Sequence, residues 1–152
     1  MAAQLIDADI DAPVLKIKLD GFDTHEAPPW RHRDLLRDLG RGLSGLRQAL
    51  IQSGRWQDTL VMTYSEFGRR AVENESMGTD HGTAAPHFLM SGGLNGGIWG
   101  AHPDLGNLTE GDMEFTLDYR TMYHTVLRDW FGLAQNRFES HFDPALDGVL
   151  RS

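Results

Sequence analysis

The stretch that decides the expected fold is VLKIKLDGFDTH, residues 14–25. Residues 14–19 form a short run of β-type residues, and the Asp-Gly pair at 20–21 is a turn signal that ends this run. Asp23 and His25 follow directly after the turn. The stretch therefore predicts a strand that brings a carboxylate and an imidazole to its carboxyl end.

Two further elements extend this pattern. Between residues 31 and 52 the leucines recur at helical spacing, and a Ser-Gly pair then ends the helix. Residues 59–64 form a nearly continuous apolar run, which is typical of a buried parallel strand, and residues 88–90 form a third short strand. Strand, helix and strand make one right-handed βαβ unit. The fold class predicted is α/β, with a mainly parallel sheet flanked by helices.

The remaining segments complete the expected domain. A polar loop at residues 65–85 joins the second and third strands, and loops of that length are usually functional. A last helix spans about residues 117–131. We expect a single domain over residues 1–152, in which residues 1–12 and 134–152 are peripheral.

The composition limits the partners of this chain. A formal net charge of −8 on 152 residues argues against binding to a nucleic-acid backbone, which requires clustered Lys and Arg. There is no cysteine, so a bound metal would use oxygen and imidazole ligands. No apolar run reaches the roughly 18 residues of a membrane span, and the N-terminus has no secretory signal pattern. As written, the chain is expected to be cytoplasmic.

Acidic and imidazole side chains lie next to each of the predicted strands. In a parallel α/β sheet the carboxyl ends of the strands line one crevice, so groups far apart in sequence meet there. We therefore expect five metal ligands: Asp23, His25, Glu66, Asp80 and His81. Carboxylate and imidazole without thiolate form the ligand set of Zn, Mn or Mg sites in hydrolases. Such an ion activates a water molecule and stabilises negative charge on an oxygen.

Catalytic roles are expected for Glu66, Arg69 and His81. Arg69 follows Glu66 in the same loop, where a guanidinium can hold a phosphate or sulfate with two hydrogen bonds. The structural alternative for Arg69 is an ordinary surface ion pair. Ser65 also lies at a strand end, but no histidine is in local register to activate it. Asp118 is interpreted as a partner of the helix dipole at the start of the last helix.

Several motifs in order resemble the domain-of-unknown-function family 1501. They are GFDTH (21–25), YSEFGRR (64–70), EN (73–74), GTDHGT (78–83), the glycine-rich 92–97 and DYR (118–120). The resemblance covers about residues 14–133. The family is bacterial and assigned to the alkaline phosphatase and sulfatase superfamily, so the resemblance implies part of an alkaline-phosphatase-like fold.

The resemblance also implies how the ligands correspond. Ser65 to Gly68 is similar to the Ser-Asp-His-Gly segment of that superfamily, with Glu66 in place of the Asp. Phe67 replaces the histidine and cannot bind metal. Asp80 and His81 would then supply the later imidazole. In the alternative registration, residues 80–82 are the Asp-His-Gly segment itself.

Only the C-terminal half of such an enzyme is represented in this resemblance. The superfamily nucleophile comes from an N-terminal segment, and longer relatives are often exported. The chain is then expected to be a fragment or a short variant, or to complete its site by association. A half-sheet would expose an edge and an apolar face, which favours a homo-oligomer.

Three functions follow from these observations. The first is a metal-dependent hydrolase of phosphate, sulfate or carboxylic esters, in which a metal-activated water attacks an anionic or ester small-molecule substrate. The second is a truncated, non-catalytic module for metal binding or oligomerisation. The third is an esterase that uses Ser65 as its nucleophile.

Overall fold

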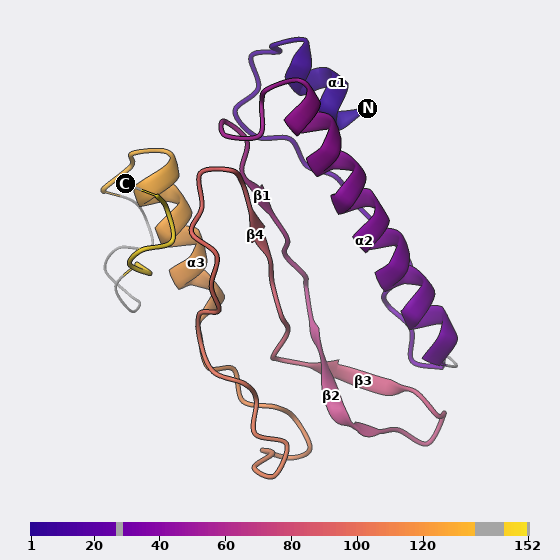
Figure 1. Cartoon of the computed structure of the whole chain (residues 1–152). Helices are drawn as coiled ribbons and strands as arrows, with labels where there is room; N and C mark the ends of the chain where they lie inside the picture. Colours follow the sequence, from indigo (N-terminus) through magenta and orange to yellow (C-terminus); the bar gives the residue numbers. More distant parts are fainter. Residues whose placement is uncertain (27–28, 136–144, 152) are drawn as a thin grey trace.

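The computed structural model describes residues 1–26, 29–135 and 145–151. Its elements in chain order are α1 (Ala2–Asp7), α2 (Pro29–Gln52), β1 (Val61–Met62), β2 (Gly68–Glu73), β3 (Thr79–Gly82), β4 (Leu89–Met90), α3 (Tyr119–Thr125) and the π-helical turn η1 (Val126–Trp130). Figure 1 shows β1 and β4 between the long helix α2 on one side and α3 on the other, with the β2–β3 hairpin below them near the N-terminal end of α2. None of the helices among the described residues is long and apolar enough to cross a membrane.

Helix α2 confirms the prediction made from the leucine spacing. Most leucines of its apolar face are half-buried, Leu36 is exposed, and Leu50 in the last turn is fully buried. The helix ends at Gln52, and the chain turns away at Gly54, whose φ of +73° is the left-handed conformation that glycine adopts easily. The amide of Arg55 donates to the carbonyl of Leu50 at 2.8 Å, which satisfies one of the free carbonyls of the last turn.

The predicted parallel sheet is wrong. Among the described residues, β1 pairs with β4 and β2 pairs with β3, both antiparallel, in two separate two-stranded sheets. The physical reason lies in residues 65–85, which were expected to form a loop. Most of this segment folds into the β2–β3 hairpin, so the chain turns back and β4 returns beside β1 in the opposite direction (Figure 1).

The first predicted strand is also wrong. Residues 14–19 are extended, but they belong to no strand and all of them are exposed. They lie close to the end of β1, because the Lys16 ammonium is 5.2 Å from the centre of the Tyr64 ring. Helix α2 therefore connects an extended segment to β1 without producing a hydrogen-bonded pair of parallel strands.

Most of the buried side chains among the described residues lie in α3 or next to it. Thr121 and Thr125 are fully buried, and Val149 from the C-terminal segment is nearly so. Leu94 and Leu150 form an isolated antiparallel bridge that holds this segment in place. The predicted last helix is confirmed, with a start at Tyr119 and a π-helical last turn. Part of the tail expected to be peripheral thus contributes to the core, while residues 136–144 lie outside the described residues.

Candidate metal centre

The loop at residues 20–25 is attached to the β2–β3 hairpin at two points. The Arg69 guanidinium donates to the carbonyl of Phe22 at 2.6 Å and to that of Thr79 at 2.5 Å. The amide nitrogen of Asn74 donates to the carbonyl of His25 at 3.1 Å. The two attachments lie on either side of Asp23 in the sequence, so they hold this residue against the hairpin.

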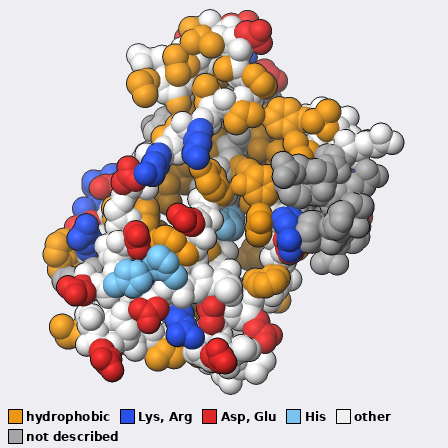
Figure 2. Space-filling model, turned by 180° about the vertical axis from the view of Figure 1, so that it is seen from behind, with side chains coloured by type: hydrophobic (Ala, Val, Ile, Leu, Met, Phe, Trp, Pro, Cys, Tyr) orange, Lys and Arg blue, Asp and Glu red, His pale blue; other side chains and the backbone are white. Residues whose placement is uncertain are grey.

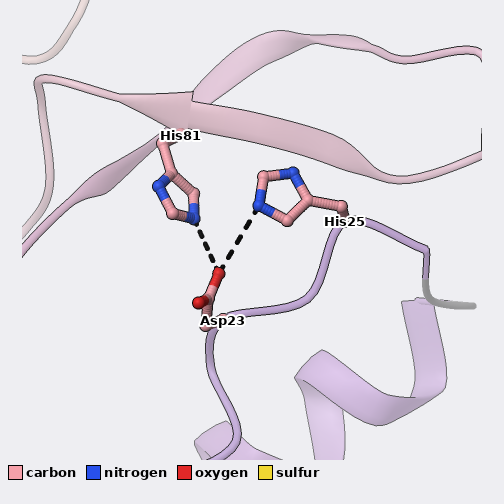
Figure 3. Close-up of side chains that lie close together, drawn as sticks. All are labelled: Asp23, His25 and His81. Carbon is pink, nitrogen blue, oxygen red and sulfur yellow. Dashed lines mark hydrogen bonds and ion pairs between the residues drawn. The ribbon is translucent and has the colours of Figure 1, made fainter.

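Three side chains converge at this junction. Asp23 and His25 come from the loop and His81 comes from β3, and Figure 3 shows both imidazoles pointing toward the Asp23 carboxylate. Asp23 Oδ1 lies 2.9 Å from His81 Nε2 and 3.5 Å from His25 Nε2. One ligand atom from each residue lies within 4.8 Å of the other two. We call these three residues the triad.

The spacing of the triad fits a bound metal ion. Bonds of about 2.0–2.1 Å at tetrahedral angles separate two ligand atoms by about 3.4 Å. The 3.5 Å distance from Asp23 Oδ1 to His25 Nε2 is close to this separation. The 2.9 Å distance to His81 Nε2 is that of a direct hydrogen bond and would lengthen by about 0.5 Å around an ion. Two imidazoles and one carboxylate are donors typical of zinc and related transition metals, whereas magnesium prefers oxygen ligands alone. Three protein ligands leave a coordination position open, as in catalytic zinc sites.

The triad is accessible from solvent. The side chains of Asp23, His25 and His81 are 69%, 53% and 39% exposed. Figure 2 shows histidine side chains side by side on this face of the molecule, with acidic side chains around them. An ion from solution therefore has direct access to the triad.

Asp80 lies on the other side of the His25 ring. Its Oδ1 atom is 3.4 Å from His25 Nδ1 and 3.1 Å from the amide nitrogen of Asn74. The hydrogen bond from Asn74, followed by that from His25, holds the pKa of the Asp80 carboxyl below its usual value. Asp80 was predicted as a direct ligand, but in this structure it contacts the ring nitrogen of His25 that faces away from the triad.

Phe67 supports the second imidazole. Its ring stacks on His81 with the centres 3.7 Å apart and the planes 5° from parallel. The Arg69 guanidinium carbon lies 5.0 Å from the centre of the Phe67 ring. From the sequence, Phe67 is only a position at which a metal-binding histidine is missing. Its position directly before β2, which pairs with the strand that carries His81, was the available signal for this contact.

Asn74 is the other residue whose role was missed. Its side-chain oxygen accepts from the amides of Ser76 at 3.0 Å and Gly78 at 2.9 Å, which shapes the β2–β3 turn. The pattern of an Asn followed by Ser and Gly is a recognisable turn signal. Only the structure shows that the same side chain also reaches His25 and Asp80.

The other predicted site residues are placed apart from the triad or are engaged elsewhere. Among the described residues, the acidic and histidine groups close enough to share one ion are those of the triad, and Glu66 is not one of them. Glu66 is exposed, and after Asp20 its carboxylate adds to the charges that raise the pKa of Lys18. Arg69 lies beside the triad, with its guanidinium on two backbone carbonyls. The Ser65 hydroxyl donates to the carbonyl of Phe67 at 2.7 Å. The catalytic roles of these residues stay predictions.

The geometry defines a class of protein, namely one that carries an exposed cluster of two histidines and one aspartate able to hold a metal ion. The chain belongs to the family described as protein of unknown function (DUF1501), whose family model matches residues 1–141. This match confirms the family expected from the motifs. No curated protein and no solved structure matched the chain.

Proposed function

We propose that this chain binds one divalent transition-metal ion through Asp23, His25 and His81, and that the site hydrolyses an anionic ester. The observation that carries the proposal is the convergence of two imidazole Nε2 atoms on one oxygen of Asp23. His81 is 58 residues from Asp23 in the sequence, so the fold itself brings them together. The resemblance of the motifs to alkaline phosphatases and sulfatases supports the ester as substrate.

The chemistry divides between the ion and the protein. A divalent ion bound here would act as a Lewis acid and lower the pKa of a water molecule beside it. The two imidazoles would bind the ion through the lone pairs of their neutral rings. The Asp23 carboxylate would lower the net charge of the site. Arg69 is beside the triad, and the bonds to Phe22 and Thr79 use two of the five N–H donors of a guanidinium. The remaining donors are available to orient a phosphate or sulfate group.

Metal binding is tested first and without any substrate. Metal content of the purified protein and zinc titration by calorimetry should give one ion per chain. His81→Ala should lower the affinity at least tenfold, because it removes one of three ligands. His102→Ala is the matched control, since His102 is an exposed histidine outside the triad. Equal affinity of both variants would show that zinc binds elsewhere.

Hydrolysis is tested separately with phosphate, sulfate and carboxylic esters of p-nitrophenol. We expect turnover by the zinc-loaded protein, loss of turnover with a chelator and recovery when the metal is restored. Turnover that persists in chelator and in His81→Ala would remove the metal-dependent reaction. The Ser65 reaction then becomes the remaining explanation, and an organophosphate probe that labels Ser65 would identify it.

The second candidate is a non-catalytic metal-binding module. The exposure of the triad favours it, because electrostatic stabilisation of a transition state is strongest where water is excluded. Stoichiometric zinc without turnover on all three ester types would identify this function. The same experiment therefore separates the two candidates.

A further inference from the structure

Asn74 makes every hydrogen bond that its amide group offers. A primary amide has two N–H donors and an oxygen with two lone pairs. The nitrogen donates to the carbonyl of His25 and to Asp80 Oδ1, both at 3.1 Å. The oxygen accepts from the backbone amides of Ser76 and Gly78. Since all four contacts are made at once, this side chain has one preferred orientation.

That orientation fixes the position of Asp80. One oxygen of its carboxylate accepts a hydrogen bond from the Asn74 side-chain amide and lies 3.4 Å from Nδ1 of His25. A carboxylate can only accept hydrogen bonds, and both ring nitrogens of His25 face one, Nδ1 facing Asp80 at 3.4 Å and Nε2 facing Asp23 at 3.5 Å. The Nδ1 pair has the geometry of a hydrogen bond, whereas the Nε2 pair is an ionic contact, so the arrangement favours the proton of the neutral imidazole on Nδ1. The lone pair of the ring is then on Nε2, which is the nitrogen that faces Asp23 in Figure 3.

We propose that Asn74 and Asp80 are positioning residues that hold His25 as the Nδ1-protonated tautomer and aim Nε2 at the metal ion. The inference deepens the proposed metal site and rests on it for the affinity effect, while the tautomer is a property of the metal-free protein. Asn74 acts twice, since it orients Asp80 through one proton and holds the backbone of His25 through the other. The role of Asp80 is then to support a ligand and not to contact the ion.

Loss of this support has a defined consequence. In metal sites, removal of a carboxylate that holds a ligating histidine costs about 10- to 100-fold in metal affinity. Asp80→Ala should fall in this range. Asp80→Asn keeps an oxygen that can accept from Nδ1, so it should recover part of the loss. Asn74→Asp keeps the acceptor for the turn but removes both donors and adds a charge next to Asp80, so it should resemble Asp80→Ala.

The test uses the whole chain and two independent measurements. The first is the tautomer of His25 in the metal-free protein, read from the ¹⁵N shifts of its ring at about pH 8, where an ordinary imidazole is neutral. The signals are assigned by their loss in His25→Gln. The second is zinc affinity by calorimetry. Glu75→Gln is the control, because Glu75 is exposed in the same turn and its change removes one carboxylate charge nearby.

The outcomes separate this inference from the proposed function. An Nδ1-protonated His25 in the wild type, a shift toward the Nε2-protonated form in Asp80→Ala and a zinc affinity at least tenfold lower support the positioning role. Glu75→Gln should change neither measurement. A wild type that binds zinc while Asp80→Ala binds it equally, or a His25 protonated on Nε2, overturns the positioning role. A wild type that binds no zinc, with the expected tautomer, overturns the proposed function instead.

Discussion

The two imidazoles of the triad are held by different kinds of neighbour. His25 has a carboxylate against Nδ1, and this directional contact fixes the rotation of its ring. His81 has the face of Phe67 against its own face, which fixes the plane of the ring but not its rotation within that plane. The direction of His81 Nε2 is then set by its 2.9 Å contact with Asp23.

Replacement of Phe67 by Leu should weaken zinc binding about 2- to 10-fold. The reason is the loss of a stacked aromatic pair, which contributes about 0.5–1.5 kcal/mol beyond buried area. Phe67→Tyr keeps the stack and should bind zinc as the wild type does. Phe115→Leu removes an exposed phenylalanine outside the triad and serves as the control. Zinc titration by calorimetry measures all four proteins, and a Phe67→Leu protein with wild-type affinity would contradict the prediction.

At the residue scale, ligand chemistry was easier to predict than ligand geometry. Asp23, His25 and His81 were expected because their donor types lie next to predicted parallel strands, and the structure brings them together although the strands are not parallel. Glu66 was included because a buried strand was expected to end beside it, and no such parallel sheet exists among the described residues. Asp80 has the correct donor type, but a sequence cannot show which ring nitrogen of His25 it faces.

At the scale of elements, the β2–β3 hairpin depends on two facing glycines, Gly68 and Gly82. A Cβ atom on Gly68 would lie 1.9 Å from the carbonyl oxygen of Ala84, which is far inside van der Waals contact. A Cβ on Gly82 would meet the backbone of Arg69 at 2.7 Å. This close approach of two backbones sets the position of His81, the neighbour of Gly82 in β3.

Gly68→Ala should therefore destabilise the protein by about 1–3 kcal/mol, the usual cost of an overpacked site. The matched control is Gly42→Ala in α2, where an added Cβ meets no atom within 4 Å. Alanine is the better helix former by about 1 kcal/mol, so this variant should be more stable than the wild type. Urea unfolding followed by circular dichroism measures both changes. Opposite signs are expected, and two stabilising substitutions would contradict the hairpin contact.

Helix α3 has a charged N-cap whose contribution depends on pH. The Asp118 carboxylate accepts a hydrogen bond from the backbone amide of Arg120 at 2.9 Å and another from the guanidinium of the same residue. The side-chain hydrogen bond from Arg120 is the main cause that holds the pKa of Asp118 below its usual value. The lowered pKa means that the charged Asp118 stabilises the folded state. This stabilisation is fully present at a pH above the unfolded carboxyl pKa of about 3.9, and it is lost as the pH falls through the lower pKa of the folded state.

Asp118→Ala should cost about 1 kcal/mol at pH 7, the typical value for loss of an N-cap. Asp118→Asn keeps a capping oxygen, so it should be closer to the wild type at pH 7 but lack the extra loss of stability below about pH 4. Thermal unfolding between about pH 3 and pH 7 measures both effects. If Asp118→Asn and the wild type lose stability in parallel as the pH falls, Asp118 does not contribute to the acid dependence.

The two longer helical segments could be predicted from the sequence because their signals are local, whereas the six-residue α1 lies in residues 1–12, which were expected to be peripheral. The spacing of apolar residues identified α2 and α3, and Asp118, interpreted as a partner of the helix dipole, is the N-cap of α3. The strands were predicted at residues 59–64 and 88–90, where β1 and β4 lie, but their direction was wrong. An apolar run does not specify the partner of a strand, since a buried parallel strand and a short antiparallel one give the same pattern over a few residues.

On the scale of the whole molecule, the chain exposes more surface than a compact monomer of its size. A folded monomer of 17.0 kDa has an accessible surface of roughly 7,700 Å². The surface of this chain is 10763 Å², which is about 40% larger. Many large apolar side chains contribute to the difference, including Val14 and Ile17 in the extended segment before α2. Such surface favours association over an isolated monomer.

Self-association is therefore the last prediction. Residues 14–19 are extended, exposed and part of no strand, so they offer both apolar side chains and an edge for strand pairing with a second copy. Light scattering after size-exclusion chromatography should give a mass that is a multiple of 17.0 kDa. The double substitution Val14→Lys with Ile17→Lys should shift the protein toward the monomer, because charges on an exposed edge oppose pairing. Ala12→Lys adds a charge at an exposed position just before the segment and should leave the mass unchanged. A wild type that stays monomeric at about 100 μM, within the range of concentrations at which exposed apolar surface drives association, would show that this surface is stable in water.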